Sequence, residues 1–454
     1  MSRILAETRI RKISEEQRRT RTEQRPRRGS GLNCLVLGGG GREYAIAWRL
    51  ARSDSVAMID VVPGNAGMAL FTTVRDYPPR DIARLEQHLA AAQIDLAIVG
   101  PDDLVAEGVA DTLRRGSIAV VGPSRAASKI EWSKTFAKEL MNETAVPCAR
   151  WETFSTAEAA KNAIDRNKWT PPLVMKADGL AAGKGVTICR TLDEARVALG
   201  TPPINSGRIV FEEFLEGEEA SLQALVDGET VVALPPARDH KRLGDGDTGP
   251  NTGGMGAVSP TSVIPDEDAQ SAADELITPV ARALAASGNP FRGVIFAGVI
   301  KTSRGFRVLE YNARFGDPEA EVTLPRIGGD FAQLMLALGE GQLAQYVREH
   351  PLRTSQRAFV DVVLCSEGYP FVPKTGATIT GLDRLPDGVY AFHGATRGTP
   401  GGGFVTAGGR VVHIVAGGAT VDEARERAYR GAETVEFEGK FYRSDIARGE
   451  VAVA

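Results

Sequence analysis

From residue 32 onward the chain alternates short apolar runs with amphipathic stretches of helical length, and this alternation limits the folds open to it. An apolar run at residues 34–37 is followed by a helical pattern that ends near Leu50. Further strand-like runs lie at residues 57–62, 96–99 and 118–121, and further helical stretches lie at residues 81–92 and 104–114. Repeated strand–helix units of this kind predict a parallel sheet covered by helices. We expect this first domain to end near residue 131.

After residue 131 the pattern changes, because strand-like runs follow one another with turns between them. Residues 208–215, 220–226 and 230–234 are expected to form an antiparallel set. Helices are expected near residues 132–142 and 272–286, and two more strands at residues 293–301 and 306–312. From about residue 346 short strands and many glycines precede one late helix at residues 421–434, which is typical of a small, mostly β cap.

These patterns predict an α/β multidomain protein, and 454 residues are too many for one ordinary hydrophobic core. The expected parts are a basic disordered extension at residues 1–31, a Rossmann-like parallel-sheet N-terminal domain at 32–131, a central domain at 132–345 and a small mostly β C-terminal domain at 346–454.

Composition narrows the possible partners and the compartment. A net charge of -4 gives no excess of positive charge to hold a nucleic acid, and the apolar runs are far shorter than the ~20 residues of a membrane span. Cys34, Cys148, Cys189 and Cys365 lie far apart, without the spacing of metal ligands. We therefore expect a cytoplasmic protein with reduced thiols, with no nucleic acid or membrane partner and no obligate protein partner.

The first 31 residues differ from the rest, because ten Lys and Arg residues stand against four Glu and no apolar stretch could form a signal-peptide core. A disordered arm is the favoured interpretation. A fusion remnant or misplaced start, a transit peptide and a docking arm remain alternatives.

A glycine cluster at residues 38–41, followed by Arg42 and Glu43, joins the first strand to the first helix. Backbone N–H groups and the helix dipole make such a junction an anion site. The dinucleotide fingerprint GxGxxG is not met, because Glu43 or Tyr44 stands where its third glycine belongs. A sugar-phosphate site is favoured over an NAD site and over a merely structural turn.

A second cluster, at residues 176–185, resembles a P-loop but has three residues between its glycine and Gly183-Lys184, and Gly185 and a strand-like run follow. A glycine-rich turn between two strands can still fold over a triphosphate as a flap, with Lys176 neutralising phosphate charge. An exposed flexible hairpin is the alternative.

Glu310 and Asn312 would share one face of a strand, and such hard oxygen ligands suit Mg²⁺. Arg314 would then lie near the reacting phosphoryl group. A solvated strand face would explain the same triplet if it stood alone.

Residues 239–256 form a long polar glycine-rich segment, which we expect to be a loop. It begins with Asp239, His240, Lys241 and Arg242. A loop that closes over a carboxylate substrate is one interpretation, since acyl-phosphate chemistry must exclude water, and a solvated charge run is the other.

Several separated strings together resemble the glycinamide ribonucleotide synthetase family, also called phosphoribosylamine–glycine ligase, of the ATP-grasp superfamily. The strings are Gly-Gly-Arg-Glu at 40–43, Pro-Gly-Asn-Ala-Gly at 63–67, Val-Gly-Pro at 99–101, Lys-Ala-Asp-Gly-Leu-Ala-Ala-Gly-Lys-Gly-Val at 176–186, Glu-Glu-Phe-Leu-Glu-Gly-Glu-Glu-Ala-Ser at 212–221, Asp-His-Lys-Arg at 239–242, Asp-Thr-Gly-Pro-Asn-Thr-Gly-Gly-Met-Gly at 247–256, and Asn-x-Arg-Phe-Gly-Asp-Pro-Glu at 312–319.

The resemblance implies an ATP-grasp central domain that joins glycine to phosphoribosylamine through a glycyl phosphate, in purine biosynthesis. It implies ATP and Mg²⁺ or Mn²⁺, with the metal on Glu310 and Asn312, and Arg314, Lys241 and Asp239 as catalytic residues. The ATP-binding set would be Lys134, Lys176, Gly183, Lys184, Gly185, Glu212, Glu213, Phe214, Leu215 and Glu219. The substrate-binding set would be Gly40, Gly41, Arg42, Glu43, Asn65, Gly100, Pro101, His240, Arg242, Asn251, Gly254, Asp317 and Glu319.

Three departures from the family pattern stand out. Tyr44 replaces the usual histidine, Asp102-Asp103-Leu104 replaces a Glu-Ala-Pro-like string, and the basic arm precedes the family's normal start. Three rival functions remain: another ATP-grasp ligase such as a biotin-carboxylase-like enzyme, an NAD-dependent oxidoreductase, and a non-catalytic ATP-binding relative.

Overall fold

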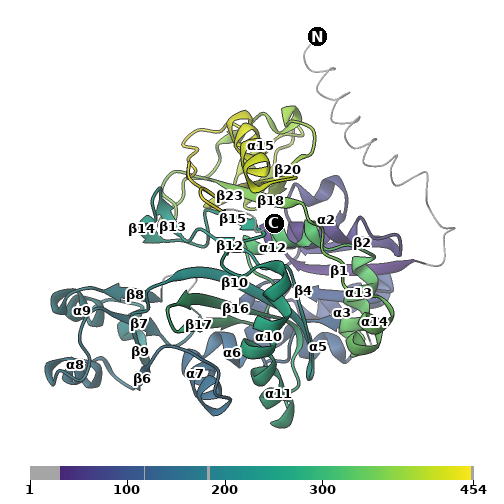
Figure 1. The fold of residues 1–454 in the computed structure, drawn as a ribbon. Coiled ribbons are helices and arrows are strands. Elements are labelled where there is room, and N and C mark those ends of the chain that lie inside the picture. The colour runs from purple at the N-terminus through teal and green to yellow at the C-terminus, as the bar shows by residue number, and fades with distance from the viewer. Residues whose placement is uncertain (1–30, 117, 181–184, 451–454) are drawn as a thin grey trace.

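The computed structural model describes residues 31–116, 118–180 and 185–450 (Figure 1). The predicted basic arm, apart from Gly31, lies outside these residues, as do the predicted ATP-binding residues Gly183 and Lys184.

The first domain contains a parallel sheet with strand order β3-β2-β1-β4-β5. Its strands are β1 Leu32–Gly38, β2 Val56–Pro63, β3 Thr73–Val74, β4 Leu96–Val99 and β5 Ala119–Val121. Both faces are covered, since Leu35 and Leu37 lie in one hydrophobic core while Cys34 and Val36 lie in another. The predicted parallel sheet is confirmed.

The helices of this domain are α2 Gly41–Leu50, α3 Ile82–Ala92, α4 Asp102–Glu107 and α5 Val109–Arg114. One prediction was wrong here, because the helix expected at residues 104–114 is interrupted at Gly108. Its φ of 82° lies in the left-handed region that glycine adopts without strain.

The middle of the chain builds two separate antiparallel sheets. The sheet of order β6-β9-β7-β8 contains β6 Trp151–Phe154, β7 Leu173–Ala177, β8 Val186–Cys189 and β9 Ile209–Glu213. The sheet of order β11-β10-β16-β17 contains β10 Glu218–Asp227, β11 Thr230–Ala233, β16 Arg292–Thr302 and β17 Gly305–Asn312. The expectation of one antiparallel set was therefore wrong: residues 209–213 pair with β6 and β7 instead of with β10.

The first of these sheets forms a projecting lobe with helices α8 Ala157–Asp165 and α9 Leu192–Leu199 (Figure 1). Helices α6 Lys129–Trp132 and α7 Lys134–Glu143 lead into it from the first domain. The helix expected at residues 272–286 is two helices, α10 Ala269–Leu276 and α11 Thr278–Ala286, because Pro279 removes a backbone donor at the junction.

The segment at residues 239–256 is not one long loop, which corrects the sequence prediction. Strands β13 Arg242–Gly244 and β14 Thr248–Asn251 pair as a hairpin. Strands β12 Arg238–Asp239 and β15 Gly256–Ser259 join a sheet of order β12-β15-β18-β23-β20, whose other members come from the C-terminal part. This part of the central region is thus built into the C-terminal sheet.

That sheet is completed by β18 Ala358–Cys365, β20 Val389–His393 and β23 Arg410–Gly418. Helix α15 Val421–Thr434 packs on β18 and β23, at the predicted position. A small sheet of β19 Thr378–Ile379, β22 Phe404–Thr406 and β21 Thr396–Gly398 lies beside it.

Helices α12 Glu319–Thr323, α13 Phe331–Glu340 and α14 Leu343–Glu349 were not predicted. Helix α13 packs against β4 and β5, and Phe331 and Met335 share a buried core with Val36 and Ile98. A helix far along the chain therefore covers one face of the first sheet.

Candidate active site

A cavity of about 1120 Å³ lies between the two middle sheets and beneath residues of the C-terminal part. It brings together predicted residues from separate segments. These residues are Arg42, Lys134, Lys176, Gly185, Glu212, Glu213, Phe214, Leu215, Glu219, Asp239, His240, Lys241, Arg242, Asn251, Glu310, Asn312, Arg314, Asp317 and Glu319. We call this cavity the cleft. The base of the glycine-rich flap and the oxygen pair on β17 thus face one space.

Lys176 on β7 connects the two sides of the cleft. Its Nζ donates to the carbonyl oxygen of Leu309 at 2.9 Å, on the opposite sheet, and lies 2.8 Å from Oε1 of Glu212. Nζ of Lys138 lies 2.9 Å from Oε2 of Glu212. Burial raises the pKa of Glu212, but the two lysines outweigh it and the net pKa is lowered, so the carboxylate stays ionised.

The sequence prediction did not include Lys138 in the site, although its helical spacing from Lys134 indicated it. It lies on α7 one turn after Lys134, so the two side chains project from the same helix face. Both pKa values are lowered, mainly by burial. Lys134, Lys138 and Lys176 are buried or half-buried, and the carboxylate of Glu212 lies between only two of them. Positive charge is therefore in excess at this end of the cleft.

The base of the flap is fastened to α7. Nζ of Lys134 donates to the carbonyl oxygen of Gly179 at 2.8 Å, and the hydroxyl of Thr135 donates to Oδ2 of Asp178 at 2.8 Å. Across the flap, the N–H of Ala177 donates to the carbonyl oxygen of Gly185 at 2.8 Å. The strands on either side of the flap are therefore held in a fixed position beside the lysines.

Glu310 and Asn312 lie at the end of β17, where both line the cleft. Burial raises the pKa of Glu310, yet Lys241, Lys176, Lys134 and Arg314 outweigh it, and the net pKa is lowered. Glu310 is thus a carboxylate at neutral pH, as a metal ligand must be.

Arg314 is held in place by three oxygens. Its Nη2 donates to Oδ1 of Asn312 at 3.2 Å, its Nη1 donates to the carbonyl oxygen of Phe315 at 3.1 Å, and its Nε lies 3.1 Å from Oε1 of Glu131. Glu131, which the sequence prediction missed, also accepts from the N–H of Ala313 at 2.9 Å. A buried acid from α6 therefore orients this arginine toward the cleft.

Asp239 and Lys241 face a group of other acids in the cleft. Burial raises the pKa of Asp239 to about 7; Lys241 opposes this shift, while Glu319, Glu219 and Glu310 add to it. Nζ of Lys241 lies 3.4 Å from Oε2 of Glu219, and the pKa of Lys241 is well above its usual value, chiefly because of Asp239. Glu319 accepts from the hydroxyl of Ser221 at 2.7 Å.

The other residues of the 239–256 segment have structural partners. Nε2 of His240 accepts from the N–H of Ala447 at 3.1 Å, and burial lowers its pKa to about 4, so the imidazole is neutral. Nη1 of Arg242 donates to the carbonyl oxygen of Gly249 at 2.6 Å, within the hairpin that also contains Asn251. Gly254 does not line the cleft; its φ of 111° and its closeness to Pro318 require a glycine there.

Of the predicted first-domain residues, only Arg42 lines the cleft. The other predicted residues of this domain are not among the lining residues: Gly40, Gly41, Glu43, Asn65, Gly100 and Pro101. Glu43 accepts from the N–H of Gly40 at 2.8 Å and from Nε of Arg42 at 2.6 Å, and so caps its own helix. Nδ2 of Asn65 donates to the carbonyl oxygen of Gly39 at 2.9 Å and to that of His393 at 2.7 Å, which ties this domain to β20.

The residues that depart from the family pattern, Tyr44, Asp102 and Asp103, differ in where they lie relative to the cleft. The ring of Tyr44 is buried and stacks on Phe392, with 5.2 Å between centroids, so it packs against the C-terminal sheet instead of entering the cleft. Asp102 lines the cleft, whereas Asp103 pairs with the exposed Arg80.

The C-terminal part supplies two cleft residues that the sequence prediction missed, Arg410 and Tyr369. Nη1 of Arg410 lies 2.8 Å from Oδ1 of Asp317 and donates to the carbonyl oxygen of Gly253 at 2.6 Å. The hydroxyl of Tyr369 accepts from the N–H of Gly253 at 2.8 Å. No local pattern could reveal them, because their partners are distant in the chain.

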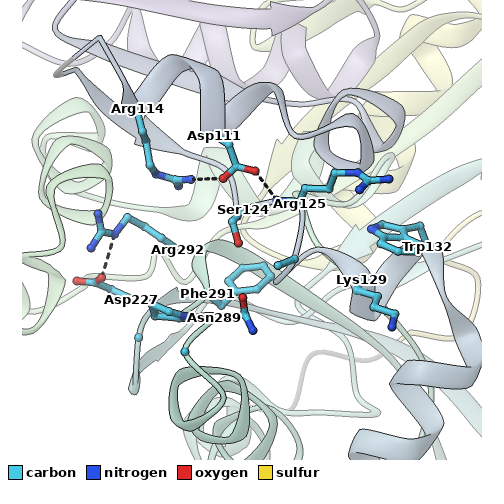
Figure 2. Close-up of a pocket in the computed structure, with 14 residues that line it drawn as sticks. Asp111, Arg114, Ser124, Arg125, Lys129, Trp132, Asp227, Asn289, Phe291 and Arg292 are labelled. Carbon is cyan, nitrogen blue, oxygen red and sulfur yellow. Dashed lines mark hydrogen bonds and ion pairs between the residues drawn. The ribbon is translucent and has the colours of Figure 1, made fainter.

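A second hollow, of about 800 Å³, lies between α5 and the loop before β16 (Figure 2). Its arginines already have partners: Arg292 lies 3.3 Å from Asp227, and Arg114 lies 3.9 Å from Asp111 and donates to backbone carbonyls. Because two of the three arginines that line this hollow are already paired with acids in its wall, the cleft is the stronger candidate for an active site.

Comparison with known proteins agrees with this geometry. Residues 32–131, 132–320 and 359–449 match the N domain, the ATP-grasp (A) domain and the C domain of phosphoribosylglycinamide synthetase. The phosphoribosylamine–glycine ligases of Mesorhizobium japonicum and Yersinia pestis are each 42% identical to this chain, over 93% of it and 99% of their own length. The chain belongs to the phosphoribosylamine–glycine ligase family.

The family and fold class predicted from the sequence are thus confirmed, and the chain is an ATP-dependent carbon–nitrogen ligase of purine biosynthesis. The crystal structure of the phosphoribosylamine–glycine ligase of Thermotoga maritima superimposes with a TM-score of 0.78 at 36% identity, covering 92% of this chain and 100% of that one.

A biotin carboxylase domain of Hydrogenobacter thermophilus, in complex with MgADP, superimposes with a TM-score of 0.67 at 16% identity. The superposition covers 91% of this chain and 92% of that domain, and it shows a shared fold only. The oxidoreductase and biotin-carboxylase-like alternatives are therefore set aside. Among the described residues, no helix of this ligase has the length and apolar content that a bilayer span requires.

Proposed function

We propose that this ligase transfers the terminal phosphoryl group of ATP to the carboxylate of glycine in the cleft, and that the amine of phosphoribosylamine then attacks the glycyl phosphate. In the second step the C–N bond forms, the bond from carbon to the phosphate oxygen breaks, phosphate leaves and the amine gives up a proton. The observation that carries the proposal is the position of Lys176 and Glu310, which come from opposite sheets and line one cavity.

The lysine end of the cleft is the proposed site of the ATP phosphates. Lys134 and Lys176 would contact them, because they come from α7 and β7 on the two sides of the flap base. Glu212 would hold Lys138 and Lys176 in position through its two ion pairs, so we assign it a positioning role. Glu213, Phe214 and Leu215 would line the adenine slot, and Glu219 would contact the ribose.

Glu310 and Asn312 are proposed to hold the divalent metal, Mg²⁺ or Mn²⁺. An ionised carboxylate and an amide oxygen at one strand end fit such a cation. When bound, the metal neutralises charge on the transferring phosphoryl oxygens. Arg314, fixed by Glu131, would stabilise the same charge from the protein side.

The two substrates are proposed to lie beyond the phosphates, toward the first domain. Lys241 would face the carboxylate of glycine as it becomes phosphorylated, and Asp239 would accept the proton that the attacking amine releases. A carboxyl group with a pKa near 7 is suited to that exchange at neutral pH. Arg42, which is the α2 residue that lines the cleft, would face the phosphate of phosphoribosylamine.

A coupled assay of ADP release tests the proposal. Release is expected only when glycine and phosphoribosylamine are both present, and it should fall by about 10²-fold or more in Lys176→Met. Lys374→Met, which changes an exposed lysine that does not line the cleft, is the matched control and should keep full activity. ADP release that ignores either substrate would contradict the proposal and favour a non-catalytic ATP-binding relative.

The proposal places the reaction in the cytoplasm, with small molecules as the only obligatory partners. All four cysteines lie in the described part of the chain and are free thiols, which suits a reducing compartment.

A further inference from the structure

Four ionisable side chains, three of them fully buried, form a group beside the cleft, where the three parts of the chain meet; Asp317 is the member that lines the cleft. Asp317 follows β17, Glu321 lies on α12, Asp361 on β18 and His413 on β23. The side chains of Glu321 and Asp361 are 0% exposed and that of His413 is 1% exposed. We call these four residues the buried cluster.

The charges of the buried cluster do not balance within the described residues. Of its three carboxylates, Asp317 pairs with Arg410 at 2.8 Å. Nδ1 of His413 lies 2.8 Å from Oδ2 of Asp361 and 3.7 Å from Oε1 of Glu321. Within the described structure, both carboxylate oxygens of Glu321 lack a hydrogen-bond partner, and so does Oδ1 of Asp361. Such unpartnered buried oxygens are costly unless another group neutralises them.

We propose that Asp317, Glu321 and His413 bind one divalent metal ion of the zinc type, separate from the metal of the nucleotide site. Their ligand atoms lie within 4.8 Å of one another. Two ligands that are each about 2.1 Å from one ion lie at most about 4.2 Å apart, so binding requires the side chains to approach by some tenths of an ångström. An imidazole with two carboxylates suits Zn²⁺, whereas the all-oxygen pair on β17 suits Mg²⁺.

The first domain leaves room for this site. A Cβ added at Gly41 would lie 2.5 Å from Oε1 of Glu321 and 2.6 Å from Nε2 of His413. Gly41 is also the first residue of α2, so the positive end of that helix dipole faces the carboxylates. The glycine predicted to bind substrate therefore abuts the buried cluster instead of the cleft.

The alternative to a metal is a proton on Glu321. Burial together with the neighbouring acids Asp317 and Asp361 raises the pKa of Glu321 well above its usual range, so this carboxyl group holds a proton when no metal is bound. A single proton balances only one negative charge of the buried cluster. A divalent cation balances two negative charges and also contacts the carboxylate of Glu321, and it displaces the proton of that group on binding.

Metal content tests the proposal on the full chain. The protein is stripped with a chelator, incubated with Zn²⁺ in the presence of excess Mg²⁺, freed of unbound metal by gel filtration and analysed by mass spectrometry. One equivalent of Zn²⁺ is expected to remain on the wild type and on Glu310→Gln, and to fall at least tenfold in Glu321→Gln and His413→Asn. His88→Asn, which removes the histidine beside Asp60 in the first domain, is the matched control and should retain the metal.

A second measurement covers the case in which the cluster variants do not fold. Co²⁺ added to the stripped wild type should give visible absorption bands that Zn²⁺ removes and excess Mg²⁺ does not. Retention of no Zn²⁺ by the wild type, or full retention by folded Glu321→Gln, would overturn the proposal. So would a Co²⁺ signal that Mg²⁺ abolishes, because it would place the ion at the nucleotide site.

Discussion

Replacing Glu212 with glutamine should destabilise the lobe of β6 to β9 by about 3–5 kcal/mol, because it removes the one carboxylate between two buried cations. Glu212 and Lys138 are each 2% exposed, and the N–O distances to Lys138 and Lys176 are 2.9 and 2.8 Å. At an effective dielectric constant of about 20, one such pair represents roughly 6 kcal/mol of Coulomb attraction, much of which offsets the cost of burying the charges. The amide keeps the volume but leaves an ammonium group without compensation.

The assay is denaturant unfolding of the wild type and Glu212→Gln, followed by a fluorescence or circular-dichroism signal of the lobe. The double variant Glu212→Gln/Lys138→Met is expected to recover a substantial part of the loss, because the buried ammonium group is then gone. ATP should stabilise Glu212→Gln, because the triphosphate supplies negative charge to the same lysines. A loss below about 1 kcal/mol, or no recovery in the double variant, would refute the reasoning.

Four further predictions concern the cleft and its support. Arg314→Lys should lower kcat by about 10²–10³-fold with little change in KM for ATP, which steady-state kinetics would detect, because lysine cannot make the three contacts of the guanidinium group. Glu310→Gln should raise the Mg²⁺ concentration needed for half-maximal activity at least tenfold, with an unchanged melting temperature as the control. Wild-type kcat should fall as the pH drops through about 7, where Asp239 becomes protonated among Lys241 and the neighbouring acids, and this limb should be missing from the pH profile of Asp239→Asn. Gly41→Ala should lower the free energy of unfolding by about 1–3 kcal/mol, measured in urea, because its methyl group would meet Glu321 and His413; a neutral result would mean that the buried cluster can shift.

The order of elements in the first domain was predictable because its signal is local. Apolar runs of strand length between helical patterns specify a parallel sheet, and the observed strands lie within a few residues of the predicted positions. The break at Gly108 was less visible, since one glycine in an apolar-periodic stretch does not by itself end a helix.

Strand partnership in the middle of the chain was not predictable, because it depends on contacts that local sequence does not encode. Residues 209–213 have the alternation of a strand wherever they pair, and they pair with β6 and β7. In the same way β12 and β15 have no mark that assigns them to the C-terminal sheet. Two strands inside the predicted central domain therefore belong physically to the C-terminal sheet.

The sequence by itself determined the family of this ligase and indicated the groups proposed to carry its chemistry. The lysines at positions 134 and 176, the oxygen pair of β17 and the charged run at residues 239–242 are recognisable because each has a local pattern of residue types. The tertiary structure alone decided which groups support them. Lys138, Glu131 and Arg410 are ordinary charged residues in the sequence, and only folding buries each one against an opposite charge. Burial and pairing are properties of distant segments brought together, and for that reason the buried cluster of Asp317, Glu321, Asp361 and His413 has no signature along the chain.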